Sequence, residues 1–157
     1  MQSSIILVGL MGAGKSSVGR RLADYCGRPF IDMDQYLSSL IGLTIPEIFL
    51  RYGEASFRDR EERVLSALLE EAECRVVSTG GGAVLRAAAR EKMRQRGYVL
   101  YLHAPVATLV DRLQRTDVRQ RPMLGSREGL ATRVETLYKV RDPLLWSCLM
   151  PFMLIIT

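Results

Sequence analysis

The chain has 157 residues, of which 48% are hydrophobic and 25% charged, as in an ordinary soluble globule that buries one core. Its net charge of +5 comes mostly from arginines scattered along the chain, which favours small anionic substrates over nucleic acid. The cysteines at 26, 74 and 148 are odd in number and far apart, which argues against a disulfide framework or a metal cluster.

The two ends of the chain carry apolar segments that do not resemble a signal peptide or a membrane span. No basic segment precedes the first apolar run, and the apolar tail over 144–156 is interrupted by Ser147 and Pro151. We therefore expect one domain over 1–157, located in the cytoplasm and without a membrane or nucleic-acid partner. We also expect a monomer.

A glycine-rich loop follows the first predicted strand, Ile5–Val8. Residues 9–16 read GLMGAGKS and fit G-x-x-x-x-G-K-[ST], whose backbone N–H groups cradle phosphates at the start of a helix, here Lys15–Cys26. Lys15 supplies charge to the β- and γ-phosphates, and the hydroxyl of Ser16 suits Mg²⁺. The expected nucleotide-binding residues of this loop are Gly12, Ala13, Gly14, Lys15, Ser16 and Ser17. The motif predicts a nucleoside triphosphate with Mg²⁺ but does not define the phosphate acceptor.

The second predicted strand, Phe30–Asp32, ends in two carboxylates, Asp32 and Asp34. The carboxyl end of a strand is where open α/β sheets bind ligands, so these groups could hold Mg²⁺ through water and accept a hydroxyl proton. Alternatively, Asp34 caps the next helix and Asp32 is merely solvated.

A helix is predicted from Ile45, with Thr44 as its cap and Glu47 completing a capping box. A turn at 52–54 separates it from a longer helix over 54–72. Arg58 and Glu61 share a face of that helix and form either a weak surface pair or an arginine held ready for a carboxylate.

A third strand over 75–78 leads into Thr79 and the glycines at 80–82, and a helix is predicted from Ala83 to about Arg96. Three glycines at this point either form a plain turn or bring bare amides close to a ligand.

A fourth strand over 98–102 and a helix over 106–113 complete the alternation of strands and helices, which predicts a parallel sheet covered on both faces. The arginine-rich segment over 115–127 is expected to be a mobile lid over phosphates, unless its arginines are only solvated. A helix over 133–146 follows, which Pro143 should kink or end, and then a last strand over 152–157.

Six ordered motifs make the chain resemble the shikimate kinases. They are GLMGAGKSS (9–17), DMD (32–34), FRDRE (57–61), TGGG (79–82), RQRPML (119–124) and VRDPLL (140–145). The resemblance implies a three-layer α/β kinase fold with a five-stranded parallel sheet of order 2-3-1-4-5, like that of nucleoside monophosphate kinases. It also implies transfer of the ATP γ-phosphate to the 3-hydroxyl of shikimate, in the biosynthesis of chorismate and aromatic amino acids.

The resemblance also implies a role for each matched residue. Lys15, Asp34 and Arg121 would be catalytic, with Arg121 reaching the phosphates from the lid. Ser16 and Asp32 would hold Mg²⁺, and Arg115 would lie near adenine. Shikimate would be bound within about 32–61, where Ile45, Phe49, Glu54 and Phe57 line the pocket, and by glycines 80–82. The full set of expected shikimate-binding residues is Asp34, Arg58, Gly80, Gly81, Gly82 and Arg141.

The chain departs from the family pattern near its end. Leu145 stands where tyrosine is usual, and the chain stops after the last predicted strand, so its C-terminus appears shortened. Two other functions fit the residues: a kinase of the same fold for gluconate or a nucleoside monophosphate, and a nucleotide-dependent switch. Dependence of ATP turnover on an added acceptor distinguishes a kinase from a nucleotide-dependent switch.

Overall fold

The computed structural model describes residues 3–116, 128–149 and 155–156. Helices and strands follow one another along this chain. They are β1 (Ser4–Val8), α1 (Lys15–Cys26), β2 (Phe30–Asp32), α2 (Met33–Ile41), α3 (Ile45–Glu70), β3 (Val76–Ser78), the short 3-10 helix η1 (Ala83–Leu85), α4 (Ala87–Arg96), β4 (Gly97–Leu102), α5 (Val106–Gln114), α6 (Leu130–Ser147) and β5 (Ile155–Ile156).

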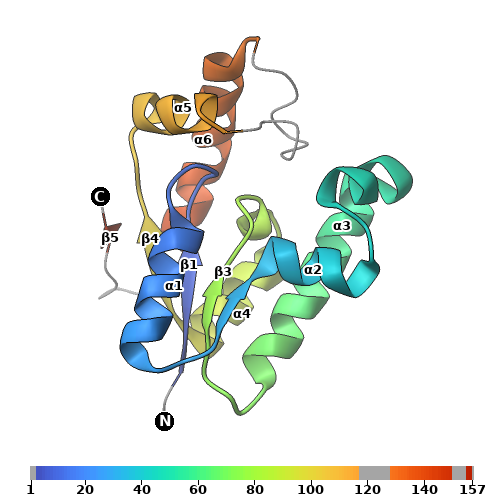
Figure 1. Ribbon diagram of the computed structural model, residues 1–157, viewed down its shortest axis with the longest axis vertical. Helices are drawn as coiled ribbons and strands as arrows, with labels where there is room; N and C mark the ends of the chain where they lie inside the picture. Colours follow the sequence, from blue (N-terminus) through green and yellow to red (C-terminus); the bar gives the residue numbers. More distant parts are fainter. Residues whose placement is uncertain (1–2, 117–127, 150–154, 157) are drawn as a thin grey trace.

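The strands form one parallel sheet in the order β2-β3-β1-β4-β5 (Figure 1). Four of them form the body of the sheet, since β5 adds only two residues, paired with Tyr101 and Leu102 at the β4 edge. Because β1 lies between β3 and β4, the chain leaves it toward β2 and β3 on one side and later returns to β4 on the other. The loop after β1 therefore lies where the strand order reverses, the usual ligand crevice of an open α/β sheet.

Helices cover the sheet on two sides, with α1 in front of it and α4 behind it in Figure 1. Ile6, Leu7 and Val8 of β1 are fully buried between these layers. On the α1 side, Gly19 lies so close to Phe30 and Leu7 that a Cβ atom there would overlap the Phe30 ring. The predicted parallel α/β sheet is thus confirmed, and burial on both faces explains why its strands read as continuous apolar runs.

Local sequence signals explain where α3 begins and bends. The Glu47 N–H donates to Thr44 Oγ1 at 3.3 Å, and the Thr44 N–H donates to Glu47 Oε2 at 2.7 Å, which is the predicted capping box. Gly53, with φ of 81°, interrupts the helix at the predicted turn, so the segments on either side of it run in different directions.

The structure corrects one predicted helix and decides one of the two effects expected of Pro143 in another. The helix expected from Ala83 begins as η1, then breaks at extended Arg86, whose Nη1 donates to Asp59 Oδ1 at 2.6 Å, and resumes as α4. Pro143 does not end the last helix, because α6 continues through it to Ser147. Burial of Arg141 and Leu145 on either side of Pro143 holds this helix in place despite the missing N–H group.

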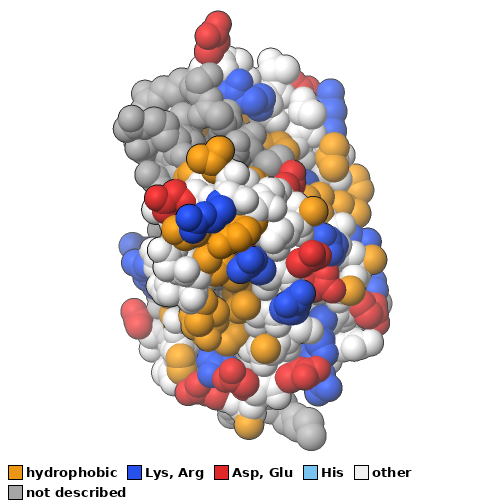
Figure 2. Space-filling view, turned by 90° about the vertical axis from the view of Figure 1, so that its right-hand side faces the viewer, with side chains coloured by type: hydrophobic (Ala, Val, Ile, Leu, Met, Phe, Trp, Pro, Cys, Tyr) orange, Lys and Arg blue, Asp and Glu red, His pale blue; other side chains and the backbone are white. Residues whose placement is uncertain are grey.

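The α2 and α3 side of the molecule carries basic, acidic and apolar side chains interspersed with one another (Figure 2). Exposed Leu40 and Leu50 belong to these two helices. Within the described ranges, no helix combines the length and the apolar character needed to cross a bilayer.

Candidate active site

Two adjoining cavities lie at the carboxyl edge of the sheet. The larger, of about 710 Å³, is enclosed mainly by α2, α3, the 80–82 glycines and α6, and the smaller, of about 300 Å³, lies over the loop after β1. Ser16, Asp32, Asp34 and Gly80 line both. The two cavities therefore form a two-part cleft in which groups bound side by side could react.

The glycine-rich loop curls around the smaller cavity. Gly12 and Gly14 have φ of 85° and 95°, a left-handed backbone that glycine adopts without strain. Gly14 is the N-cap of α1, so the free N–H groups and positive dipole end of that helix face the cavity. The Lys15 ammonium donates to the carbonyls of Gly9 and Leu10 at 2.7 and 3.0 Å, which holds a buried cation beside the smaller cavity.

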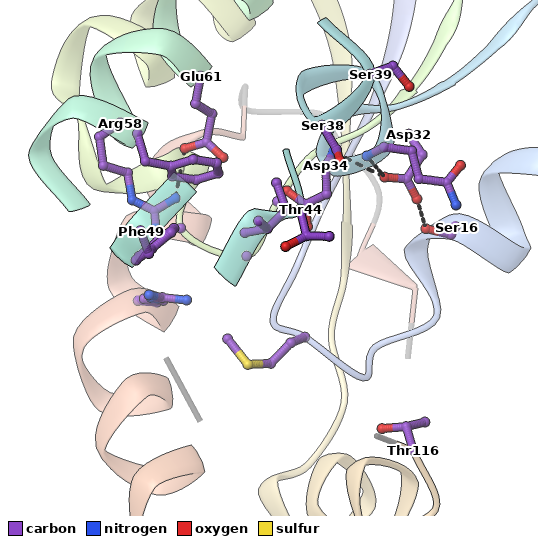
Figure 3. A pocket seen from close by; sticks show the side chains of 18 residues that line it. Ser16, Asp32, Asp34, Ser38, Ser39, Thr44, Phe49, Arg58, Glu61 and Thr116 are labelled. Atoms are coloured by element: carbon purple, nitrogen blue, oxygen red, sulfur yellow. Dashed lines mark hydrogen bonds and ion pairs between the residues drawn. The ribbon is translucent and has the colours of Figure 1, made fainter. Parts of the chain in front are cut away.

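Ser16 and Asp32 meet beside this loop. Ser16 Oγ donates to Asp32 Oδ2 at 2.6 Å (Figure 3), while Asp32 Oδ1 accepts from the backbone N–H groups of Asp34 and Gln35. Asp32, not Asp34, is therefore the N-cap of α2, because its carboxylate accepts hydrogen bonds from N–H groups of the first turn. A hydroxyl and a carboxylate in contact form a set of hard oxygen donors that suits Mg²⁺. The described residues contain no cluster of three or more metal-ligating His, Cys, Asp or Glu side chains.

Asp34 is thus left to face the cleft rather than to cap the helix. It lines both cavities, and the backbone of Gly80 packs against it. A Cβ on Gly80 would lie 2.9 Å from Asp34 Oδ1 and equally close to Glu61 Oε2. Glycine at position 80 therefore leaves room for the carboxylates of Asp34 and Glu61 to approach the backbone together, which any side chain there would oppose.

Arg58 and Glu61 form a buried pair rather than a surface pair. Arg58 Nη1 donates to Glu61 Oε1 at 2.8 Å, and the two residues are 7% and 3% exposed. Arg58 also lies over the rings of Phe57 and Phe49, 5.1 and 6.0 Å from their centroids. Burial raises the pKa of Glu61, although the neighbouring Arg58 opposes this shift. Glu61 therefore fixes the Arg58 guanidinium in one position, whereas a solvent-exposed arginine side chain would be free to move.

Arg141 of α6 reaches the same cavity from another direction. It is 1% exposed, and its Nη1 has no hydrogen-bond partner among the residues that the structure describes. Burial and the nearby positive charge of Arg58 lower the pKa of Arg141 to about 10, so it remains protonated at neutral pH. Two buried guanidinium groups that repel each other form a site that an anion would stabilise.

Gly82 makes room for Arg58. A Cβ on Gly82 would overlap the guanidinium group, although its backbone φ of −100° would accept other residues. Glycine is therefore required here because the Arg58 side chain occupies the space of a Cβ atom, and not because of the backbone conformation.

We expect Gly82→Ala to weaken binding of an anionic acceptor, since the new methyl group must displace the Arg58 guanidinium. The acceptor KM should rise by about tenfold or more while the ATP KM changes little. Steady-state kinetics check this, with Gly82→Ala in an Arg58→Ala background as the control. The alanine should have little further effect there, and an equal effect in both backgrounds would contradict the explanation.

The structure brings most of the predicted site residues together. Gly12, Gly14, Lys15, Ser16 and Ser17 line the smaller cavity, whereas Ala13 packs into the core beside it. The larger cavity is lined by Asp34, Arg58, Gly80, Gly81, Gly82 and Arg141, and by Ile45, Phe49 and Phe57. Glu54 does not line it, but lies 3.6 Å from Arg58 Nε as an ion pair. Met11 and Thr116 line both cavities, and nothing in the sequence had marked them.

Of the two arginines expected near the nucleotide, Arg115 and Arg121, the structure describes only Arg115. Arg115 pairs with Asp111 at 3.1 Å, is largely exposed and lines neither cavity. Arg112, which the sequence did not single out, lines the smaller cavity and donates to the carbonyls of Gly12 and Ala13 at 3.1 and 3.2 Å. These partners lie about a hundred residues away, so no local signal could reveal the contact. Arg121 and most of the expected lid lie outside the described residues.

The family model for shikimate kinase matches residues 11–148. The chain belongs to the shikimate kinase family. The shikimate kinase of Ruegeria pomeroyi is 45% identical over 144 residues, which are 92% of this chain and 72% of that protein. The shikimate kinase of Xanthomonas campestris is 46% identical over 121 residues, 77% of this chain and 66% of that protein.

A solved structure supports the family assignment at the level of the fold. The shikimate kinase of Acinetobacter baumannii in complex with shikimate superposes with a TM-score of 0.89 at 42% identity, covering 95% of this chain and 81% of that chain. The likeness confirms the predicted α/β P-loop kinase fold.

Proposed function

We propose that this protein is a shikimate kinase, which transfers the γ-phosphate of ATP to the 3-hydroxyl of shikimate and yields shikimate 3-phosphate and ADP. Its product would enter the biosynthesis of chorismate and the aromatic amino acids. The observation that carries the proposal is the convergence of buried Arg58 and Arg141 on one cavity that also holds Asp34 and bare glycine backbone. Shikimate is a small polyol carboxylate, and these groups complement its carboxylate and its hydroxyls.

The arrangement assigns shikimate to the larger cavity and ATP to the smaller one. Arg58 and Arg141, which both line the larger cavity, hold the carboxylate there. Asp34, at the junction of the two cavities, then faces the acceptor hydroxyl and takes up its proton as the bond to phosphorus forms. Lys15 stabilises the negative charge on the transferred phosphoryl group, and Arg121 is expected to assist it.

Mg²⁺ would be held by Ser16 Oγ, with Asp32 next to it through water. When bound, this ion neutralises charge on the β- and γ-phosphates. The 2.6 Å hydrogen bond from Ser16 Oγ to Asp32 Oδ2 supports this assignment, because it keeps the two oxygens next to each other. The capping bonds from Asp34 and Gln35 orient the Asp32 carboxylate toward the loop.

The first experiment measures ADP release from ATP and Mg²⁺ with shikimate, gluconate or a nucleoside monophosphate in separate reactions. We expect turnover with shikimate alone. Turnover with another acceptor would contradict the assignment of the larger cavity, and acceptor-independent nucleotide binding without turnover would favour a nucleotide-dependent switch.

We expect Arg58→Ala to raise the shikimate KM far more than the ATP KM. Truncating one partner of a buried charge pair costs about 2–5 kcal/mol, so the shikimate KM should rise by about 30-fold or more. Steady-state kinetics with each substrate varied in turn measure both constants. Arg63→Ala, on the exposed face of the same helix, is the matched control. Equal increases in both KM values would remove Arg58 from carboxylate binding.

A further inference from the structure

Polar and aromatic side chains connect the carboxyl-terminal half of α6 to the end of β4. Tyr138, Asp142 and Trp146 are spaced four residues apart and so share one face of α6, while Tyr101 and His103 stand at the end of β4. We call this set of five residues the β4–α6 seam. None of its members lines either cavity.

One strong hydrogen bond lies at the centre of the seam. The hydroxyl of Tyr101, a residue only 1% exposed, donates to Asp142 Oδ1 at 2.5 Å. Burial, reinforced by the Asp142 carboxylate, raises the pKa of Tyr101, so its hydroxyl remains a donor at any physiological pH. Hydrogen bonds to a charged acceptor are stronger and more directional than those between neutral groups.

Ring contacts extend this bond along the helix. Tyr101 packs edge-on against Trp146 with centroids 5.9 Å apart and against His103 at 5.6 Å. One turn toward the start of α6, His103 Nε2 and the Tyr138 hydroxyl are 3.0 Å apart. The seam therefore contacts three successive turns of α6 and restrains the rotation of the helix about its own axis.

That rotation determines where Arg141 points. Arg141 is adjacent to Asp142 in sequence, so their side chains leave α6 about 100° apart. Asp142 faces β4, whereas Arg141 enters the larger cavity with its Nη1 unpartnered among the described residues. No hydrogen bond to Arg141 itself occurs in the part of the chain that the structure describes, unlike Arg58, which Glu61 holds directly. The direction of Arg141 therefore depends on the side chains packed around it and on the helix that bears it.

We propose that Tyr101 and Asp142 are positioning residues for the shikimate carboxylate, which act by fixing the rotation of α6 and thereby the direction of Arg141. This inference rests on the proposed function. It adds that the two arginines are oriented by different means: Arg58 by a carboxylate in the pocket, and Arg141 by a hydrogen bond on the opposite side of its helix.

The test compares Tyr101→Phe, Asp142→Ala and Asp142→Asn with the unaltered protein. Because Arg141 binds the carboxylate in the ground state and the transition state alike, the first two variants should raise the shikimate KM by about tenfold. Their kcat and ATP KM should change by less than about twofold. Asp142→Asn keeps an oxygen acceptor and should restore most of the affinity. The double variant Tyr101→Phe with Asp142→Ala should have a shikimate KM no higher than that of the more impaired single variant, since both substitutions remove the same bond.

Tyr98→Phe is the matched control, because it removes a hydroxyl from an exposed tyrosine of the same strand. Thermal melts followed by circular dichroism report the folding of each variant. Calorimetric shikimate binding supplies a readout besides turnover.

Two outcomes would overturn the inference while leaving the proposed function intact. One is a shikimate KM within about twofold of the unaltered protein in both Tyr101→Phe and Asp142→Ala. The other is an equal rise in the KM of both substrates, which would indicate general loosening of the fold. If the unaltered protein neither binds nor phosphorylates shikimate, the proposed function fails first and this inference with it.

Discussion

Replacing Lys15 with alanine is expected to reduce kcat by about 10²–10³-fold or more, the scale observed when one preorganised stabilising group is removed from a transition state. Lys15 is 8% exposed, and its ammonium already lies against the loop that would surround the phosphates. A buried cation held in place needs no reorganisation when charge develops on the transferred phosphoryl group. Removal of the ammonium leaves that charge uncompensated.

Single-turnover and steady-state ADP release measure the effect of Lys15→Ala. Lys139→Ala is the matched control, because Lys139 is exposed on α6 and forms a surface pair with Glu135 at 3.3 Å. A thermal melt identifies any loss of folding caused by breaking the two bonds to Gly9 and Leu10. A folded Lys15→Ala variant with near-normal kcat would exclude the loop lysine from the chemistry.

Replacing Asp34 with asparagine is expected to lower kcat by about 10²–10⁴-fold, the usual contribution of a positioned general base. Asparagine has nearly the same shape but cannot take up the proton of the acceptor hydroxyl. The backbone of Asp34 should stay in place, because its N–H donates to the Asp32 carboxylate at 3.1 Å whatever side chain position 34 carries. ATP affinity should be unchanged.

For Asp34→Asn, kcat is measured at saturating shikimate and ATP binding by calorimetry. Asp24→Asn, an exposed position on α1, provides the same chemical change away from the cleft. If kcat is maintained in Asp34→Asn, the carboxylate only positions the hydroxyl. A parallel loss of ATP binding would instead indicate damage to the loop after β1.

Much of this fold follows from signals that lie close together in the sequence. The glycine-rich loop, the Thr44–Glu47 capping box and the turn at Gly53 each depend on backbone geometry within a few residues. Such features are encoded locally, because a cap or a left-handed turn forms between near neighbours whatever surrounds it. At Pro143 the local signal left two outcomes open, a kink or the end of a segment. Pro143 remains inside α6, since the buried side chains around it stabilise the helix more than one missing bond weakens it.

The sequence by itself determined the chemistry available to this protein: a phosphate-binding loop, two carboxylates after a strand, a helical arginine–glutamate pair and a run of glycines. Only the tertiary structure decided how these groups are used. It assigned the cap of α2 to Asp32 and left Asp34 facing the cleft. It placed Arg112 against the glycine-rich loop, and it connected Tyr101 to Asp142 across 41 residues. The physical reason is that side-chain contacts between distant segments depend on how helices rotate and pack on the sheet, which the spacing of residues along the chain does not specify.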